Sequence, residues 1–133
     1  MGSICREIRV PRSAPEVWEA IRDYGAVHRR VAPGFVIDSQ LDGRDRVITF
    51  ESGAVARERL VALDDNRLRL VYKVLEGRLS FEHHQGSVEV IGGPEGPGCR
   101  IVWTTDFLPE DLRAPLEGLM NEGAAAIASA FSD

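Results

Sequence analysis

The sequence predicts an α+β fold in which a strongly curved antiparallel sheet of about seven strands wraps round one long C-terminal helix. An apolar strand at residues 99–107 runs directly into a helix-type segment from Leu108 to Phe131. Almost everything before it has the period-two pattern of short strands, apart from two short helices near the start. A long helix buries its apolar face by lying on a sheet, and a sheet curved round it leaves space between the layers. The pattern therefore predicts an internal cavity.

Length and composition indicate a single globular domain over residues 1–133. Apolar content is 44% and charged content 28%, and no apolar stretch is long enough to cross a bilayer. The N-terminus lacks the apolar core of a signal peptide, so we expect a cytoplasmic protein with no membrane insertion. The net charge of −5 argues against a nucleic-acid partner, which requires a clustered basic face. Cys5 and Cys99 are too few for a disulfide scaffold, and we expect both to be reduced.

The two short helices are expected between the first strand and the second. Residues 3–10 alternate as a strand, and Ser13 and Glu16 then form a capping box in which each side chain bonds the other residue's amide. The following helix has one apolar face, made of Val17, Ala20, Ile21 and Tyr24. A further helical turn or two is predicted before Pro33 and Gly34 stop it.

The central part of the chain reads as successive strands separated by turn residues. They are predicted at 35–41, 46–51, 54–63, 67–75 and 80–91. The glycine-rich segment 92–98 joins two strands and no helix follows it, so we interpret it as a hairpin loop rather than a phosphate-binding loop. In the C-terminal helix, Pro115 has two readings: the helix begins near Ala114, or it is kinked at the proline.

Alternation along the strands predicts which side chains face the cavity. Where charged residues such as Arg57 and Arg59 face water, their neighbours must face inward. The resulting inward set comprises Ile48, Phe50, Ala56, Glu58, Leu60, Ala62, Leu68, Leu70, Tyr72, Val74, Ile101, Trp103, Thr105 and Phe107. We expect Leu116, Met120 and Gly123 of the helix to close the cavity, with Gly123 leaving room for a ligand.

Among the polar residues of this set, Glu58 is the strongest candidate for a functional role. A carboxylate in an apolar cavity can act as a general acid or base, or it can anchor a ligand hydroxyl or amine. It can also pair with an arginine near the cavity rim, or with water. All three readings stay open from the sequence.

His84 and Glu82 are predicted to face inward if Glu89 faces out, although a bulge at Gly86 would reverse this. Glu58, Glu82 and His84 offer one nitrogen and two oxygen ligands to a metal, but their spacing matches no known motif. We therefore expect no metal and no cofactor. His84 is expected to be a hydrogen-bonded cavity side chain or an exposed one.

Three sequence segments carry a resemblance to a known superfamily. They are Val10–Trp18 at the front, Pro33-Gly34 before the second strand, and Val102–Thr104 in the last strand. Together they resemble the START/SRPBCC (birch-pollen-allergen-like) helix-grip superfamily, close to the polyketide cyclase/dehydrase family. The resemblance implies the helix-grip fold and a ligand-binding cavity.

A more distant resemblance links Ser52-Gly53, Glu58–Leu60 and Leu63–Asp65 to the gate loop and following strand of abscisic-acid receptors. It implies a gate loop at Ser52, Gly53 and Ala54. The gate here is shorter, and Val36–Asp38 stands where those receptors carry a ligand-pairing lysine, so we do not expect the same hormone.

These observations predict a protein that binds a small hydrophobic or amphipathic molecule, as a monomer or homodimer. The predicted ligand-binding residues are Phe50, Glu58, Leu60, Tyr72, His84, Trp103, Thr105, Leu116, Met120 and Gly123. The alternative is a polyketide cyclase/dehydratase-type enzyme in which Glu58 and His84 act as general acid and base. A third reading, a protein-interaction module, has no outward apolar stripe in its favour.

Overall fold

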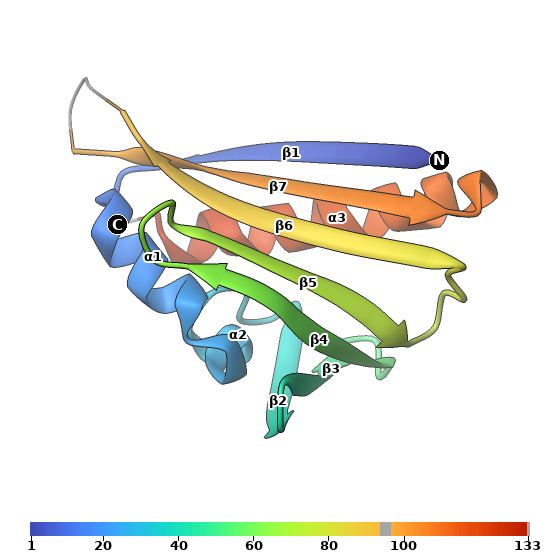
Figure 1. The fold of residues 1–133 in the computed structure, drawn as a ribbon. Coiled ribbons are helices and arrows are strands. Elements are labelled where there is room, and N and C mark those ends of the chain that lie inside the picture. The colour runs from blue at the N-terminus through green and yellow to red at the C-terminus, as the bar shows by residue number, and fades with distance from the viewer. Residues whose placement is uncertain (94–96, 133) are drawn as a thin grey trace.

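One seven-stranded antiparallel sheet curves round the C-terminal helix, which confirms the predicted fold class (Figure 1). The computed structural model describes residues 1–93 and 97–132, so residues 94–96 of the predicted hairpin loop lie outside the described part. The strands in chain order are β1 (Gly2–Val10), β2 (Val36–Asp42), β3 (Asp45–Phe50), β4 (Val55–Asp64), β5 (Arg69–Glu76), β6 (His83–Gly92) and β7 (Cys99–Leu108). Their order across the sheet is β1-β7-β6-β5-β4-β3-β2.

The curvature of the sheet is concentrated on the side that carries β4. Strands β1, β7 and β6 pair without interruption, whereas the pairing of β4 with β5 shifts register between Arg57 and Glu58 and again between Leu60 and Ala62. Such bulges bend a strand and increase its twist. In Figure 1, β2 and β3 accordingly run steeply across the direction of β1 and β7.

The second bulge corrects one predicted orientation. Beyond it, the inward face passes from Ala62 to Leu63, since a one-residue shift exchanges the two faces of a strand. Ala62 is exposed, and Leu63 packs against the core. The pairing of β6 with β7 runs through Gly86 without a register shift, so Gly86 hosts no bulge, and the pairing of β6 with β5 ends at Gly86 and Tyr72.

The N-terminal helices cover one end of the sheet. They are α1 (Ala14–Arg22), the 3₁₀ turn η1 (Tyr24–Ala26) and α2 (Val27–Arg30). The Ser13 hydroxyl accepts from the Glu16 amide at 3.3 Å, as predicted, but the Glu16 carboxylate pairs with Arg12 instead of completing the capping box. The predicted apolar face of α1, together with Tyr24, is buried.

The C-terminal helix begins after a short 3₁₀ turn, η2 (Glu110–Leu112), and α3 runs from Arg113 to Ala130. Pro115 is therefore in the first turn, where a backbone amide has no partner inside the helix. The reading in which the helix begins near Ala114 is correct. Helix α3 turns one face to the sheet, formed by Leu116, Met120, Gly123 and Ile127.

Gly86 is a specific packing requirement of the sheet. A Cβ at this position would lie 2.5 Å from the ring carbon Cζ of Tyr72, whereas a Cβ at Gly92 of the same strand would approach only the Cβ of Ala14, at 3.4 Å. We expect Gly86→Ala to lower the free energy of unfolding by about 1–3 kcal/mol, the usual cost of overpacking. Gly92→Ala is expected to stay within about 0.5 kcal/mol. Urea unfolding measures both, and equal stabilities for the two variants would contradict this packing.

Candidate functional site

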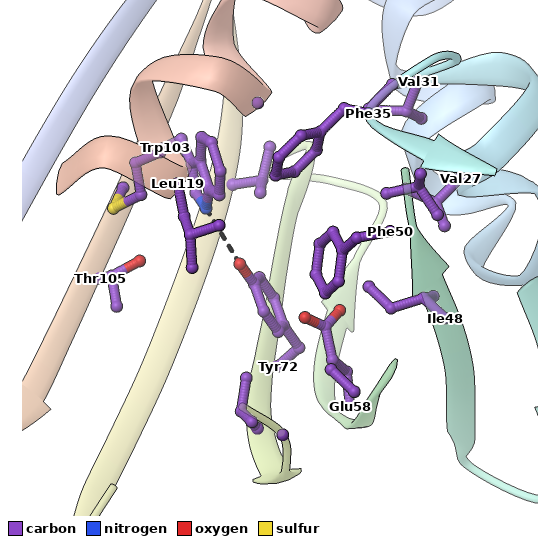
Figure 2. Close-up of a pocket in the computed structure, with 18 of the residues that line it drawn as sticks. Val27, Val31, Phe35, Ile48, Phe50, Glu58, Tyr72, Trp103, Thr105 and Leu119 are labelled. Carbon is purple, nitrogen blue, oxygen red and sulfur yellow. Dashed lines mark hydrogen bonds between the residues drawn. The ribbon is translucent and has the colours of Figure 1, made fainter. Parts of the chain in front are cut away.

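A cavity of ≈ 170 Å³ lies between the concave face of the sheet and α3 (Figure 2). Its lining comes from β2 to β7, the N-terminal helices and α3, and it is mostly aliphatic or aromatic. On the same measure one water needs about 10–15 Å³, so the space is larger than a site for a single water. Within the described residues no helix has the length and apolar character needed to span a membrane.

Most of the predicted ligand-binding residues line this cavity. They are Phe50, Glu58, Tyr72, His84, Trp103, Thr105, Leu116, Met120 and Gly123, together with Ser52 and Ala54 of the predicted gate loop. Leu60 does not belong to the lining. It lies next to the second bulge of β4, and its half-buried side chain packs against the core cluster that contains the first helices.

Glu58 forms a buried ion pair with Arg46, directly opposite on β3. The Arg46 nitrogens Nε and Nη2 lie 2.9 and 2.8 Å from Glu58 Oε1, and the two side chains are only 11% and 9% exposed. Arg46 also donates from Nη1 to the Tyr24 carbonyl at 3.2 Å and stacks 4.0 Å from the Tyr24 ring centroid. Of the three readings of Glu58, the pairing with an arginine is confirmed, although the partner lies in the interior rather than at the rim.

Sequence reasoning overlooked Arg46, although the signal was present. The alternation that turns Ile48 and Phe50 inward also turns Arg46 inward. A buried arginine requires a charged partner, and Glu58 is the inward carboxylate on the neighbouring strand. Together, the two rules would have predicted the pair.

The second oxygen of Glu58 faces the cavity. Both contacts from Arg46 go to Oε1, and within residues 1–93 and 97–132 no side chain or amide donates a hydrogen bond to Oε2. Figure 2 shows the carboxylate next to Phe50 on the cavity side of β4. Oε2 is thus a hydrogen-bond acceptor available to whatever occupies the cavity.

Tyr72 and Trp103 form a polar contact across the cavity wall. Trp103 Nε1 donates to the Tyr72 hydroxyl at 3.0 Å, and the Tyr72 ring lies in the space left by Gly86. Burial, followed by the charge of Glu58, raises the pKa of Tyr72 above its ordinary value. The phenol therefore keeps its proton, and because it already accepts from Trp103 it can still donate.

Gly123 does not leave the room for a ligand that the sequence suggested. A Cβ there would meet ring carbons of Trp103 at 3.0 Å and of Phe35 at 3.2 Å, so these aromatic side chains use the space.

His84 is a buried, neutral histidine. Its Nδ1 accepts from the Val74 amide at 3.1 Å, so in the neutral ring the proton is on Nε2. Burial, and secondly the neighbouring His83, lowers the pKa of His84 to about 4. Of the two predicted states, the hydrogen-bonded cavity side chain is the one observed.

A metal site is not assembled from the predicted ligands. Glu82 precedes β6, is exposed and does not belong to the cavity lining that contains Glu58 and His84, so its predicted inward orientation is wrong. In the described part of the chain, no three His, Cys, Asp or Glu side chains are grouped to hold an ion.

The cavity has a mouth between the β3–β4 turn and α3. A second, outer hollow shares Phe35, Phe50, Ser52, Arg78 and Leu119 with the cavity and adds Glu51 and Glu122. Phe35 and Phe50 meet edge to face with ring centroids 5.2 Å apart. The predicted gate loop thus lies at the mouth, and the two phenylalanines line both the cavity and the outer hollow.

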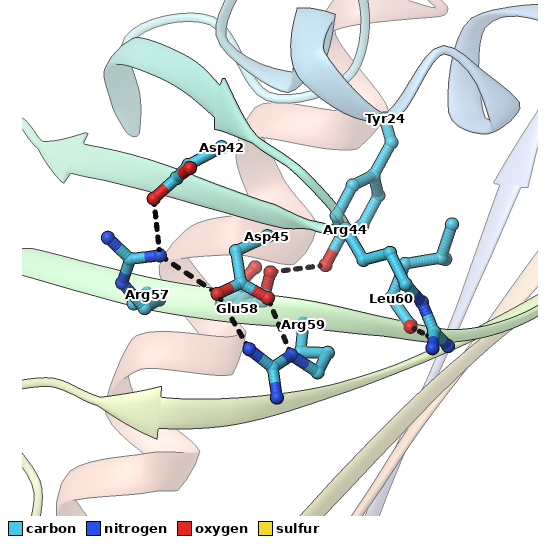
Figure 3. A network of polar contacts seen from close by, with 8 residues as sticks. All are labelled: Tyr24, Asp42, Arg44, Asp45, Arg57, Glu58, Arg59 and Leu60. Carbon is cyan, nitrogen blue, oxygen red and sulfur yellow. Dashed lines mark hydrogen bonds and ion pairs between the residues drawn. The ribbon is translucent and has the colours of Figure 1, made fainter.

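The outer face of β3 and β4 carries a separate charge network (Figure 3). Asp45 accepts from Arg59 at 2.7 Å and from Arg57 at 2.8 Å, and Arg57 also reaches Asp42. The bonds from Arg59, followed by those from Arg57, lower the pKa of Asp45 to about 2. The hydroxyl of Tyr24 donates to the Glu58 carbonyl at 3.0 Å. Polar contacts therefore fix this strand pair on both faces, which holds Arg46 and Glu58 in place.

A curved sheet that grips a C-terminal helix over a largely apolar cavity defines a helix-grip protein. The chain belongs to the polyketide cyclase/dehydrase and lipid transport family, whose model matches residues 1–132.

Solved structures show the same fold. The protein XoxI from Bacillus cereus superposes with a TM-score of 0.87 at 20% identity, over 98% of this chain and 96% of that one. A protein of Thermobifida fusca gives 0.76 at 26% identity, over 97% and 89%. Norcoclaurine synthase of Thalictrum flavum, a point mutant in complex with a transition-state analogue, gives 0.71 at 20% identity, over 96% and 92%.

The buried pair predicts strong coupling between its two residues. Glu58→Gln leaves Arg46 charged and unpaired, which should lower the free energy of unfolding by about 3 kcal/mol or more. Adding Arg46→Met should recover part of this loss, with a coupling of at least about 1 kcal/mol. Urea unfolding of the single and double variants measures it.

The Glu110–Arg113 pair, at 2.7 Å but 55% and 40% exposed, provides the control. Glu110→Gln is expected to change stability by about 0.5 kcal/mol or less. Additive effects of the Glu58 and Arg46 substitutions would contradict the coupling.

The low pKa of His84 predicts that acid lowers the stability of the folded protein. Its pKa of about 4 in the folded protein lies below the ordinary value of about 6.5, so between these pH values the unfolded chain binds more protons and acid favours unfolding. From pH 7 to pH 4 the free energy of unfolding of the wild type should fall by on the order of 2–3 kcal/mol more than that of His84→Asn. Denaturant titrations across this range measure the difference. His83→Asn removes only the smaller cause of the lowered pKa of His84 and should keep most of the wild-type slope, because the burial of His84 remains. A wild-type slope in His84→Asn would refute the prediction.

Proposed function

We propose that this protein binds a small apolar or amphipathic molecule in the cavity between the sheet and α3. The molecule would enter the cavity past Phe35 and Phe50. The observation that carries the proposal is the largely apolar cavity with a mouth, in which Glu58, Tyr72 and Trp103 make defined bonds within the protein. Apolar pockets with a few placed polar groups are typical of small-molecule sites. The family description, which includes lipid transport, supports this reading.

The enzyme alternative has weaker support from the same side chains. Glu58 is held in an ion pair with Arg46, and His84 uses Nδ1 to accept from the Val74 amide, so both side chains already make structural bonds within the protein. The family description also names cyclases and dehydrases, and norcoclaurine synthase shares the fold. A fold hosts many functions, however, and these two residues are the ones on which the alternative depends. A cytoplasmic location and a monomeric or homodimeric state stay predictions.

Ala56 and Ala62 provide a matched test, because both are on β4 but only Ala56 is buried and lines the cavity. Ala56→Leu should fill part of the cavity and weaken ligand binding at least tenfold, whereas Ala62→Leu should bind as the wild type does. Native mass spectrometry and thermal shift against a panel of small apolar compounds measure binding, with Ala56→Val as the milder variant if Ala56→Leu does not fold.

The mass of the released ligand separates the two functions. A ligand recovered unchanged supports binding, and a new product mass indicates catalysis. Equal affinities for Ala56→Leu and Ala62→Leu would remove the cavity as the binding site.

A further inference from the structure

The inner part of the cavity presents a hydrogen-bond acceptor and a donor on neighbouring strands. Glu58 Oε2 is the acceptor and the Tyr72 hydroxyl is the donor, on the neighbouring strands β4 and β5 (Figure 2). In the strand register Leu60 pairs with Tyr72, so Glu58 is a diagonal neighbour of Tyr72 on the same face. The two side chains therefore lie on the same wall of the cavity.

The only buried cation of the cavity, within the part of the chain that the structure describes, is already neutralised. Arg46 points Nε and Nη2 at Glu58 and Nη1 at the Tyr24 carbonyl, so each of its three nitrogens contacts an oxygen of the protein. His84 is neutral because its pKa is about 4. Arg78 also lines the cavity, but it is exposed at the mouth, where water screens its charge.

We propose that Glu58 and Tyr72 form an inner subsite that selects a neutral head group able both to donate and to accept a hydrogen bond. This proposal rests on the proposed function. An alcohol, a phenol or a primary amide fits this description. A carboxylate of the same shape is rejected.

The selectivity follows from the donors, acceptors and charges of the ligand and of the subsite. A ligand hydroxyl donates to Glu58 Oε2 and accepts from the Tyr72 hydroxyl, so both protein groups and the ligand are satisfied. A carboxylate has no proton for Oε2, meets the negative charge of Glu58 and loses its hydration. The buried acceptor would then remain unpaired, a second penalty.

Three probes with one ring system test the proposal on the full chain at pH 7.5: 2-naphthol, 2-naphthamide and 2-naphthoate. The amide and the carboxylate have nearly the same shape, so they differ in charge and in the donated proton. We expect 2-naphthol and 2-naphthamide to bind at least tenfold more tightly than 2-naphthoate in calorimetric or fluorescence titrations. Equal or tighter binding of 2-naphthoate overturns the proposal and leaves the proposed function intact.

Two substitutions assign the selectivity to the subsite. Glu58→Gln leaves the positive charge of Arg46 uncompensated, so the preference should shift toward 2-naphthoate by at least tenfold. Tyr72→Phe keeps the ion pair and should weaken 2-naphthol several-fold without changing the affinity for naphthalene. Tyr72→Phe also serves as the decisive variant if Glu58→Gln does not fold. Unchanged selectivity in the variants that fold overturns the proposal.

Arg78→Gln tests whether the carboxylate binds at the mouth instead. Suppose that 2-naphthoate binds the wild type tightly, but that Arg78→Gln lowers its affinity below that of 2-naphthol. The carboxylate then lies at Arg78 in the wild type, and the inner subsite retains its selectivity. If naphthalene binds and 2-naphthol does not, the inner subsite is refuted. If none of the four compounds binds, the proposed function fails as well.

Discussion

The buried pair of Arg46 and Glu58 is the interaction on which the rest of the site depends. Removing both charges from water is costly, and the pair repays that cost only through close geometry and further bonds. Those bonds come from outside the strand pair, since Arg46 reaches the Tyr24 carbonyl and the Tyr24 hydroxyl returns to the Glu58 carbonyl. The pair thereby joins the curved half of the sheet to the segment that follows α1.

The same pair determines the chemistry of the cavity. Because both Arg46 contacts to Glu58 use one carboxylate oxygen, the guanidinium that lines the cavity is ion-paired and the second oxygen is left for a ligand. Tyr72 beside it is a donor that keeps its proton, and His84 is uncharged. A site that contains two full charges therefore offers a ligand acceptors and donors rather than a free cation, and this favours neutral polar head groups over acids.

Much of the fold and part of the site followed from local sequence rules. Period-two alternation placed Glu58, Tyr72 and Trp103 on one face of the sheet. Because proline is tolerated in the first turn of a helix, a helix start just before Pro115 was one of the two predicted possibilities. The orientation of Ala62 was wrong and the place of Leu60 was missed, since the bulge that separates them comes from the pairing of β4 with β5 and has no signature in β4 itself. The role of Gly123 depends on which aromatic ring approaches it, and only tertiary packing decides that.

Two glycines determine how much of the space between sheet and helix remains for a ligand. The Tyr72 ring lies over Gly86 at a distance that a Cβ would not allow, and Trp103 and Phe35 approach Gly123 so closely that a Cβ there would push them aside. With any larger residue at either position, these rings would have to move, and the adjoining space is the cavity. The position of the aromatic wall therefore depends on Gly86 of β6 and Gly123 of α3. Because the Tyr72 ring over Gly86 also carries the hydroxyl that serves as a donor, the size of the cavity and the polar groups it presents are coupled at Gly86.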